Sequence, residues 1–461
     1  MTELSGALPA PFWLTQDGAP AAADPLETAE SADLAVVGAG YSGLWTALLA
    51  RERDPQRDVV VLEAQTAGSA ASGRNGGFCS ASLTHGFDNG LSRFPAELGE
   101  LERLGRENLD EIAATVGRYQ IDCDFERTGE LNVATEPWQW RELAASFAQE
   151  SARGLDVQLL DRDAVRAEVD SPTYLGGRWD RTGCAMLDPA RLVWGLRRAC
   201  LELGVRIYEN TPVERITATA AGLRLHTPRG RVDAARVALA TGAHAGLLRR
   251  LRHYVVPVYD YALMTAPLTA DQLASIGWKR RQGIGDAGNQ FHYYRLSAGN
   301  RILWGGYDAV YYRDGRVAPE HDQREATFRI LADHFAQTFP QLEGVTFTHK
   351  WGGAIDTCSR FSGFFGTAHR GRLAYAVGYT GLGVGATRFG AKVMLDLLTG
   401  ERTELTSLKM VRRKPVPFPP EPVRSGVINL TQWSIARADS HGGRRNVWLK
   451  TLDKFGVGFD S

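Results

Sequence analysis

Three glycines near the start of the chain, spaced Gly-x-Gly-x-x-Gly, constrain its fold most. Gly38, Gly40 and Gly43 follow the apolar run 34–37 and precede the largely apolar run 44–50. This order predicts a strand, a tight turn and a helix. Gly38 permits the turn, Gly40 lets a phosphate approach the backbone, and Gly43 lets the helix pack on the strand. Because N–H groups at a helix start attract phosphate, the segment predicts a dinucleotide site.

A second apolar run supports this interpretation. Residues 59–62 predict a neighbouring strand that ends on Glu63, about 20 residues beyond the turn, where a carboxylate can accept hydrogen bonds from ribose hydroxyls. An acidic residue at this place disfavours a 2′-phosphorylated ribose. Tyr41 and Ser42 in the turn, and Ala64 after Glu63, are further candidate cofactor-binding residues.

Charge and length exclude several function classes. The chain has 461 residues with 53 basic and 53 acidic side chains, so no net field attracts nucleic acid or an anionic membrane. A small molecule is the expected partner. The length predicts more than one domain. No run reaches the roughly 18 apolar residues of a membrane span, and the first 30 residues do not resemble a signal peptide, which predicts a cytoplasmic protein.

The five cysteines do not suggest a metal centre or a disulfide framework. Their number is odd and they form no Cys-x-x-Cys pair, so we expect reduced thiols and no metal site.

Helical patterns and small-residue loops organise the rest of the chain. Residues 68–77 read as a glycine-rich loop against a ligand, and 91–116 and 137–153 read as helices. Asp188 and Pro189 predict the start of a helix that ends at Gly204. Further helices are expected over residues 325–339 and 387–398.

Strand patterns indicate two sheets. Short strands are expected at 205–208, 213–217, 223–226 and at Val232, and the strand and glycine in 236–244 are expected to return to the dinucleotide-binding domain. From 255 to 304 the pattern has period two and is aromatic, which predicts an antiparallel sheet in a second domain. The Pro-rich segment 414–422 must be extended, and the tail after it is expected to wrap the surface.

These patterns predict a division of the chain into four parts. They are an N-terminal extension (1–30), a discontinuous dinucleotide-binding domain (31–90, 155–245 and 345–410), a substrate or cap domain (91–154 and 246–344), and a Pro-rich basic tail (411–461).

The separated motifs resemble one known family. In chain order they are Gly38 to Gly43, Glu63, Ser72-Gly-Arg-Asn-Gly-Gly77, Ala240-Thr-Gly242, the segment 293–306 and Gly378-Tyr-Thr-Gly-Leu-Gly383. This order resembles the FAD-dependent glycine and D-amino-acid oxidase superfamily over about residues 10 to 405. Within it, the chain is most similar to the gamma-glutamylputrescine oxidoreductase branch.

The resemblance implies an α/β fold with a discontinuous, Rossmann-like FAD-binding domain of the glutathione-reductase type. A second α+β substrate domain built on an antiparallel sheet would cover the flavin. It also implies roles for residues that contact the pyrophosphate, the ribose, the adenine and the two ends of the flavin. These are Gly38, Gly40, Gly43, Glu63, Ser72, Arg74, Asn75, Gly76, Gly77, Val213, Thr241, Gly242, Gly378, Thr380, Gly381, Leu382, Gly383 and Val384.

The implied chemistry is oxidation of a C–N bond. An amine or amino-acid-like substrate loses a hydride to flavin N5, and the resulting imine hydrolyses to an aldehyde or keto product. The amine must be neutral at that step, and an apolar aromatic pocket lowers its pKa. Candidate catalytic residues are His292, Tyr259 and Tyr261, with Arg295 and Arg360 as candidates for binding a substrate carboxylate. Alternating aromatic residues also fit ordinary core packing.

Two departures from the family leave the electron acceptor open. Relatives such as monomeric sarcosine oxidase carry a lysine after the last glycine motif and another on the strand before Gly305, and neither has a match here. Oxygen and another acceptor are both compatible with the sequence. The spacing of Cys358 does not match a covalent flavin link, so non-covalent FAD is expected. A hydroxy-acid or alcohol oxidase and a structural or redox-sensing flavoprotein remain alternatives.

Overall fold

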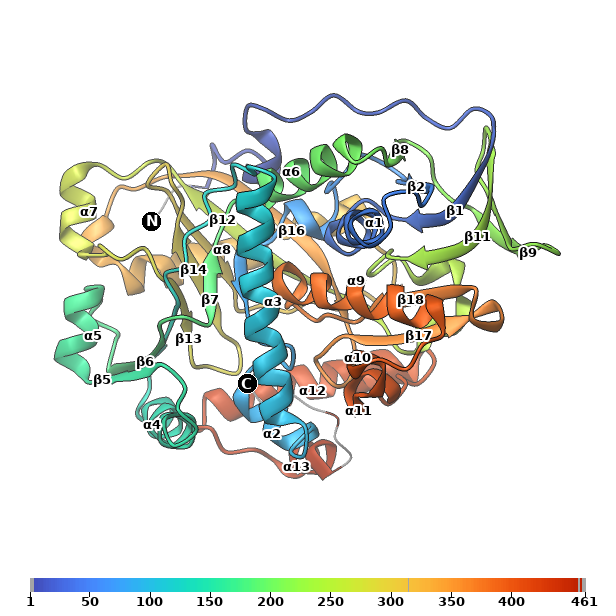
Figure 1. The fold of residues 1–461 in the computed structure, drawn as a ribbon. Coiled ribbons are helices and arrows are strands. Elements are labelled where there is room, and N and C mark those ends of the chain that lie inside the picture. Colours follow the sequence, from blue (N-terminus) through green and yellow to red (C-terminus); the bar gives the residue numbers. More distant parts are fainter. Residues whose placement is uncertain (1–3, 314, 455–456, 458–461) are drawn as a thin grey trace.

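The computed structural model describes residues 4–313, 315–454 and 457, and it contains two large sheets (Figure 1). The first has the order β17-β18-β11-β1-β2-β8, with β10 paired to β11 and β9 paired to β10. Its strands from β18 to β8 are parallel, whereas β17, β10 and β9 join antiparallel. The bounds are β1 Ala29–Val37, β2 Val59–Leu62, β8 Arg206–Tyr208, β9 Arg215–Ala218, β10 Leu223–His226, β11 Arg231–Leu239, β17 Phe364–Ala368 and β18 Leu373–Val377.

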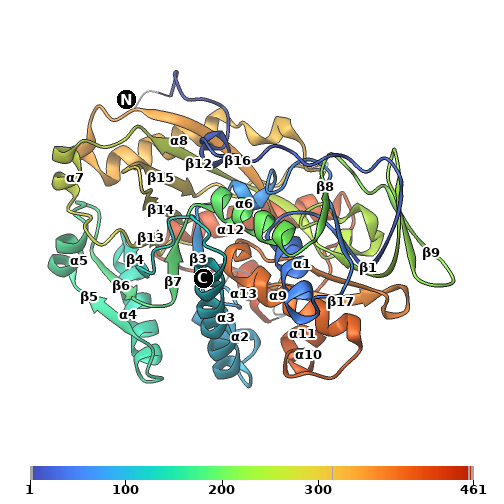
Figure 2. The same cartoon turned by 45° about the horizontal axis from the view of Figure 1, so that its top comes forward.

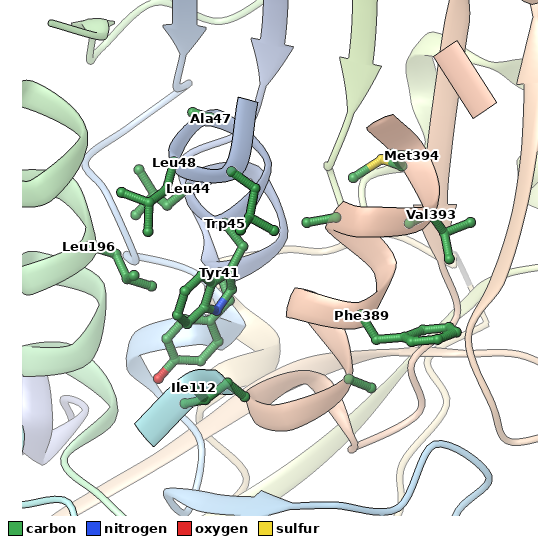
Figure 3. Close-up of a cluster of buried hydrophobic side chains, with 14 of the residues drawn as sticks. Tyr41, Leu44, Trp45, Ala47, Leu48, Ile112, Leu196, Phe389, Val393 and Met394 are labelled. Carbon is green, nitrogen blue, oxygen red and sulfur yellow. The ribbon is translucent and has the colours of Figure 1, made fainter. Parts of the chain in front are cut away.

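Helix α1 (Tyr41–Arg53) lies at the centre of the core that covers this sheet. It packs against α6 (Pro189–Glu202) and α9 (Gly383–Thr399). Its first ten residues are all buried, so α1 is apolar all round rather than amphipathic. Figure 3 shows Leu196 of α6 and Val393 and Met394 of α9 around it. Each fully buried side chain of this kind contributes about 1.5–3 kcal/mol.

The second sheet has the order β16-β12-β15-β14-β13-β4-β6-β5 and is antiparallel except for the β13–β4 pair. Helix α8 (Glu325–Thr338) packs on β12 and β15 (Figure 2). The strand bounds are β4 Glu130–Ala134, β5 Val157–Leu160, β6 Gly176–Asp180, β12 Val256–Thr265, β13 Gly283–Asp286, β14 His292–Leu296, β15 Ile302–Gly306 and β16 Phe347–Thr357.

The remaining elements connect or cover the two sheets. A small sheet pairs β3 (Phe78–Ser80) with β7 (Cys184–Met186). The other helices are α2 Phe87–Arg93, α3 Leu98–Arg118, α4 Pro137–Ser151, α5 Arg162–Glu168, α7 Ala270–Ile276, α10 Glu404–Ser407, α11 Lys409–Arg412, α12 Val423–Asp439 and α13 Val447–Lys454.

The predicted fold class is confirmed, and several elements lie where the sequence places them. The Asp188 carboxylate caps α6 by accepting from the backbone N–H of Arg191 at 3.0 Å, and Gly204 follows with a φ of +80°. Helix α9 begins at Gly383, earlier than the expected 387, because the glycines there conceal a helix start from propensity alone.

Sheet membership differs from the predicted segments in two places. Strands β5 and β6 fall within 155–245 but pair with β4 of the second sheet, and β16 falls within 345–410 but pairs with β12. The sheets therefore do not follow the predicted segments at β5, β6 and β16. The domain boundaries themselves stay a prediction.

The C-terminal tail contains two helices that the sequence analysis did not predict. Residues 413–420 form neither helix nor strand and 421–422 form a turn, and α12 and α13 follow. Helix α12 is tied down by Asp439, whose carboxylate accepts from the backbone N–H groups of Asn289 and Gln290 at 3.1 and 2.9 Å. The tail is thus attached to loops of the second sheet and contributes to the wall described next.

Candidate functional site

A cavity of about 1120 Å³ lies where the two sheets meet. Its wall is formed by the glycine turn before α1, the loop 71–76, the start of α9, strands of the second sheet and the C-terminal segment. From that segment, Ile428, Thr431 and Ile435 of α12 line the cavity. Elements far apart in the sequence therefore build one site.

Two helix starts face this cavity. Gly40, Tyr41 and Ser42 at the start of α1 line it, and so do Leu382 and Gly383 at the start of α9. Neither N-cap residue supplies a side-chain cap, and the first turns of both helices lack acidic residues. Because N-terminal N–H groups and the helix dipole attract negative charge, each start suits an anionic group of a ligand.

The three glycines of the first turn are required by close backbone contacts. Gly38 has a φ of +104°, which disfavours residues with a side chain. A Cβ on Gly43 would lie 1.8 Å from the carbonyl oxygen of Gly38, and one on Gly40 would lie 2.8 Å from Ser72 Oγ. The turn, the helix and the loop at Ser72 are therefore packed as one unit.

Glu63 lies beside this turn at the end of β2. Its carboxylate accepts from the backbone N–H of Ala39 at 2.7 Å and of Gln65 at 2.9 Å. Burial raises its pKa, while these two hydrogen bonds act in the opposite direction. Each carboxylate oxygen keeps a further lone pair, so the predicted bond to a ribose hydroxyl is compatible with this arrangement.

The loop 72–77 is held in shape by its own side chains. Ser72 Oγ accepts from the Tyr41 N–H at 3.0 Å, and the Asn75 amide donates to Ala71 and Ser72 and accepts from Gly77. Arg74 lines the cavity and forms an ion pair with Asp322. The loop is thus preorganised along one wall.

Trp13 anchors this loop from the N-terminal extension. Its indole N–H donates to the Asn75 carbonyl at 2.9 Å, and its side chain is 2% exposed. Trp13→Phe keeps most of the packing and removes this hydrogen bond, which is worth about 1 kcal/mol. We expect about 5-fold weaker cofactor binding, measured by titrating the apoprotein, with an unchanged circular dichroism spectrum. Unchanged affinity would show that the bond does not hold the loop.

The other predicted cofactor residues are distributed along the same region. Gly76, Gly242, Thr380, Gly381 and Val384 line the cavity. Gly77 and Gly378 instead lie in the layer behind, where an added Cβ would meet the Leu187 carbonyl and Cys358 respectively. Ala64 is exposed and Val213 half-buried, both near the end of β2.

Thr241 differs from these residues. Its Oγ1 is buried and has no hydrogen-bond partner within the described part of the chain. An orphaned hydroxyl beside Gly242 is consistent with a ligand that supplies the partner.

Comparisons with known proteins identify the family. The model of the family described as FAD dependent oxidoreductase (DAO) matches residues 33–397. The chain belongs to the FAD-dependent oxidoreductase family. It is 32% identical over 403 residues to the gamma-glutamylputrescine oxidoreductase of Escherichia coli K12, covering 86% of this chain and 90% of the relative. It is 29% identical over 402 residues to a probable oxidoreductase, OrdL, of Haemophilus influenzae, covering 83% and 86%.

Solved structures show the same fold. Glycine oxidase from Geobacillus kaustophilus aligns with a TM-score of 0.70 at 21% identity, over 83% of this chain and 99% of that chain. At this level of identity the likeness concerns the fold.

The residues of the cavity fit the FAD of this family. The two uncapped helix starts suit the pyrophosphate and the pyrimidine end of the flavin. Cys358 donates to the carbonyls of Ser362 and Gly378, and burial raises the pKa of its thiol. Such a thiol is a weak nucleophile, which agrees with non-covalent FAD.

The predicted substrate residues are only partly brought to the cavity. Tyr261 contributes to the wall, but its hydroxyl bonds to the His321 carbonyl and to Tyr312. Tyr259 is buried and bonds to Ala318. His292 lies behind the wall, where its Nδ1 is 2.6 Å from the carboxylate of Asp286. Its other ring nitrogen is 3.0 Å from Nδ1 of His334.

Arg295 and Arg360 do not reach the cavity. Arg295 donates to the carbonyls of Leu187 and Gly77, and Arg360 to those of Ser362, Gly363 and Arg413. Burial lowers the pKa of both guanidinium groups to about 10. Their hydrogen bonds serve backbone carbonyls, so the structure offers no support for a role of either in binding a substrate carboxylate.

The sequence analysis missed the charge of the cavity wall. Within the described chain, the wall includes ten carboxylates and three guanidinium groups. The carboxylates are Asp88, Glu102, Glu130, Glu142, Glu150, Asp180, Asp260, Asp286, Asp308 and Asp356. Burial, and then repulsion from Asp180, raises the pKa of Glu130 to about 7. A wall of this charge favours a cationic ligand over an anionic one.

Two further features concern the whole described chain. Its helices include none with the length and apolar character needed to cross a membrane. Its His, Cys, Asp and Glu side chains form no group of three arranged to hold a metal ion.

Proposed function

We propose that this chain oxidises the C–N bond of a cationic amine, with FAD as the resident cofactor. The observation that carries the proposal is the acidic wall of a cavity whose other side fits FAD. The similarity to a relative named gamma-glutamylputrescine oxidoreductase supports the proposal that the substrate is an amine.

The cavity offers what such a reaction needs. Carboxylates attract the ammonium form, while Val258, Trp351 and Ile355 on the second sheet provide apolar surface that lowers the pKa of the bound amine. FAD, when bound, supplies the two-electron acceptor for a hydride from the carbon next to nitrogen. Hydrolysis of the imine product then releases an aldehyde or keto compound.

We propose that the reduced cofactor passes its electrons to an acceptor other than oxygen. We also propose that the protein works in the cytoplasm. Within the described wall the cationic side chains are Arg74, Arg106 and Arg178, and Arg74 and Arg178 are ion-paired. Burial lowers the pKa of His85, the histidine beside Gly381, which favours its neutral form. The ion pairs of Arg74 and Arg178 and the neutral form of His85 beside Gly381 support slow reaction with oxygen.

Steady-state assays with a redox dye test the proposal. Polyamines and gamma-glutamyl amines should reduce the dye, with one aldehyde formed for each two electrons, and the rate in air without dye should be lower. Hydroxy acids of similar size should give no reduction. Dye reduction by hydroxy acids and not by amines would overturn the proposal.

A further inference from the structure

Strand β12 places one carboxylate in the sheet face that covers the FAD side of the cavity. Successive residues of a strand point to opposite faces. Val258, Asp260 and Ala262 line the cavity, whereas Tyr259 and Leu263 belong to the core under α8. Asp260 is therefore an ionisable side chain within an otherwise apolar stripe.

Neighbouring donors hold the Asp260 carboxylate in place. The Tyr293 hydroxyl donates to Oδ2 at 2.6 Å, and the backbone N–H of Tyr261 donates to Oδ1 at 2.8 Å. The Tyr293 ring also packs against the loop expected to lie along the flavin, since a Cβ on Gly76 would be 2.7 Å from it. Asp260 is thus fixed beside that loop.

We propose that Asp260 binds the substrate ammonium group and accepts its proton. This inference rests on the proposed function. An N–H bond of the ammonium breaks, an O–H bond forms at the Asp260 carboxylate, and the nitrogen regains its lone pair. That lone pair then forms the C=N bond as the hydride leaves the neighbouring carbon. Tyr293 is a positioning residue, because it acts through the carboxylate.

Asp356, on the neighbouring strand β16, also lines the cavity, and it has a different task. Its Oδ2 accepts from the backbone N–H of Gly378 at 2.7 Å, and Thr380 N–H donates to its carbonyl. Asp356 therefore holds the glycine loop before α9. The other wall carboxylates on strands, Glu130, Asp180 and Asp286, lie on β4, β6 and β13, which are separated from β12 by β15 and β14.

The burial and the charged groups around Asp260 set the pH range in which its carboxylate can accept a proton. Burial raises its pKa to about 6, while the Tyr293 hydroxyl and the charge of His292, both on β14, act to lower it. The ion pair of Arg74 with Asp322 lies across the same wall. Above pH 6 the carboxylate is ionised and can bind an ammonium, and below pH 6 it becomes protonated.

Asp260→Asn tests the inference with two readouts. The first is binding of an amine whose carbon next to nitrogen bears no hydrogen, such as tert-butylamine, followed by the visible spectrum of the flavin without turnover. We expect binding about 10-fold weaker in the variant. The second is the anaerobic rate of flavin reduction by an oxidisable amine, expected to fall about 100-fold or more. Asp260→Glu should restore part of the rate.

Wild-type binding and rates in Asp260→Asn would overturn the inference. Failure of every amine to reduce the wild-type flavin would instead overturn the proposed function, so the two failures are distinguishable. The matched control is Asp233→Asn, which removes a carboxylate paired with Arg224 outside the cavity.

Tyr293→Phe provides a second test if Asp260→Asn does not fold. Loss of the hydroxyl removes a hydrogen bond that lowers the Asp260 pKa, so that pKa rises. In the wild type, reduction should slow as the pH falls through about 6, and in Tyr293→Phe this loss should begin at a higher pH. An unshifted acid limb would contradict the role of Asp260.

Discussion

Gly43→Ala is expected to yield protein without bound FAD and with a markedly lower melting temperature. The new methyl group would lie 1.8 Å from the Gly38 carbonyl oxygen and 2.9 Å from its carbon, and both atoms are backbone. No rotamer relieves this overlap, so α1 must move away from the turn. Forced repacking of this kind costs on the order of 3 kcal/mol. Flavin content from the visible spectrum and a thermal melt measure the two effects.

The control for this variant is Gly117→Ala in α3. An added Cβ there meets nothing within 4 Å, so the same chemical change lacks the clash. Because alanine favours a helix over glycine by about 0.5–1 kcal/mol, the control should match or exceed the wild-type melting temperature. A Gly43→Ala protein with full flavin and the wild-type melting temperature would contradict the described turn.

Gly385→Ala is expected to have the second largest effect, through the other helix that faces the cavity. A Cβ on Gly385 would lie 2.1 Å from the Ser80 carbonyl oxygen of β3. The buried Asn108 of α3 also donates to the Gly385 carbonyl at 2.9 Å, so the helix cannot shift freely. We expect a loss of stability on the order of 3 kcal/mol and FAD affinity at least about 10-fold lower.

Gly383→Ala is the matched variant, two residues earlier in the same helix. Its nearest neighbour would be the Thr387 methyl at 4.0 Å, which is ordinary contact. Without FAD, the melting temperature of Gly383→Ala should match or exceed that of the wild type, and that of Gly385→Ala should be lower. Equal melting temperatures for the three proteins would show that α9 does not pack on β3 as described.

Local signals in the sequence predicted the parts of the fold that depend on local chemistry. The glycine turn follows from contacts within a few residues, and α6 follows from its Asp188 cap and Pro189. The C-terminal helices were missed because α12 has only a weak apolar stripe, and its position over the cavity depends on contacts with distant loops.

The substrate side of the cavity could not be predicted because it depends on which face of a strand is turned inward. In β12 the aromatic residues Tyr259 and Tyr261 were expected to face the substrate, but both belong to the core under α8. The Tyr261 ring lies 5.6 Å from Phe328 there, and only part of Tyr261 reaches the cavity wall. Both faces of this strand are covered, so the alternation alone does not say which one faces the cavity. The inward face carries Asp260 instead.

The arginines illustrate a second limit. A guanidinium group can donate to a substrate carboxylate or to backbone carbonyls. Arg295 and Arg360 bind carbonyls that come from distant loops, such as Leu187 and Arg413. Which carbonyls lack a backbone partner is decided by the tertiary fold, and the sequence does not record it.

The visible spectrum of the purified protein, kept free of oxygen while amines are added, shows whether bound FAD accepts electrons from an amine. We expect a yellow protein whose flavin bands bleach with a polyamine or a gamma-glutamyl amine and do not bleach with a hydroxy acid of similar size. A yellow protein that none of the amines bleaches would contradict amine oxidation, and a colourless protein that cannot take up FAD would contradict the whole account.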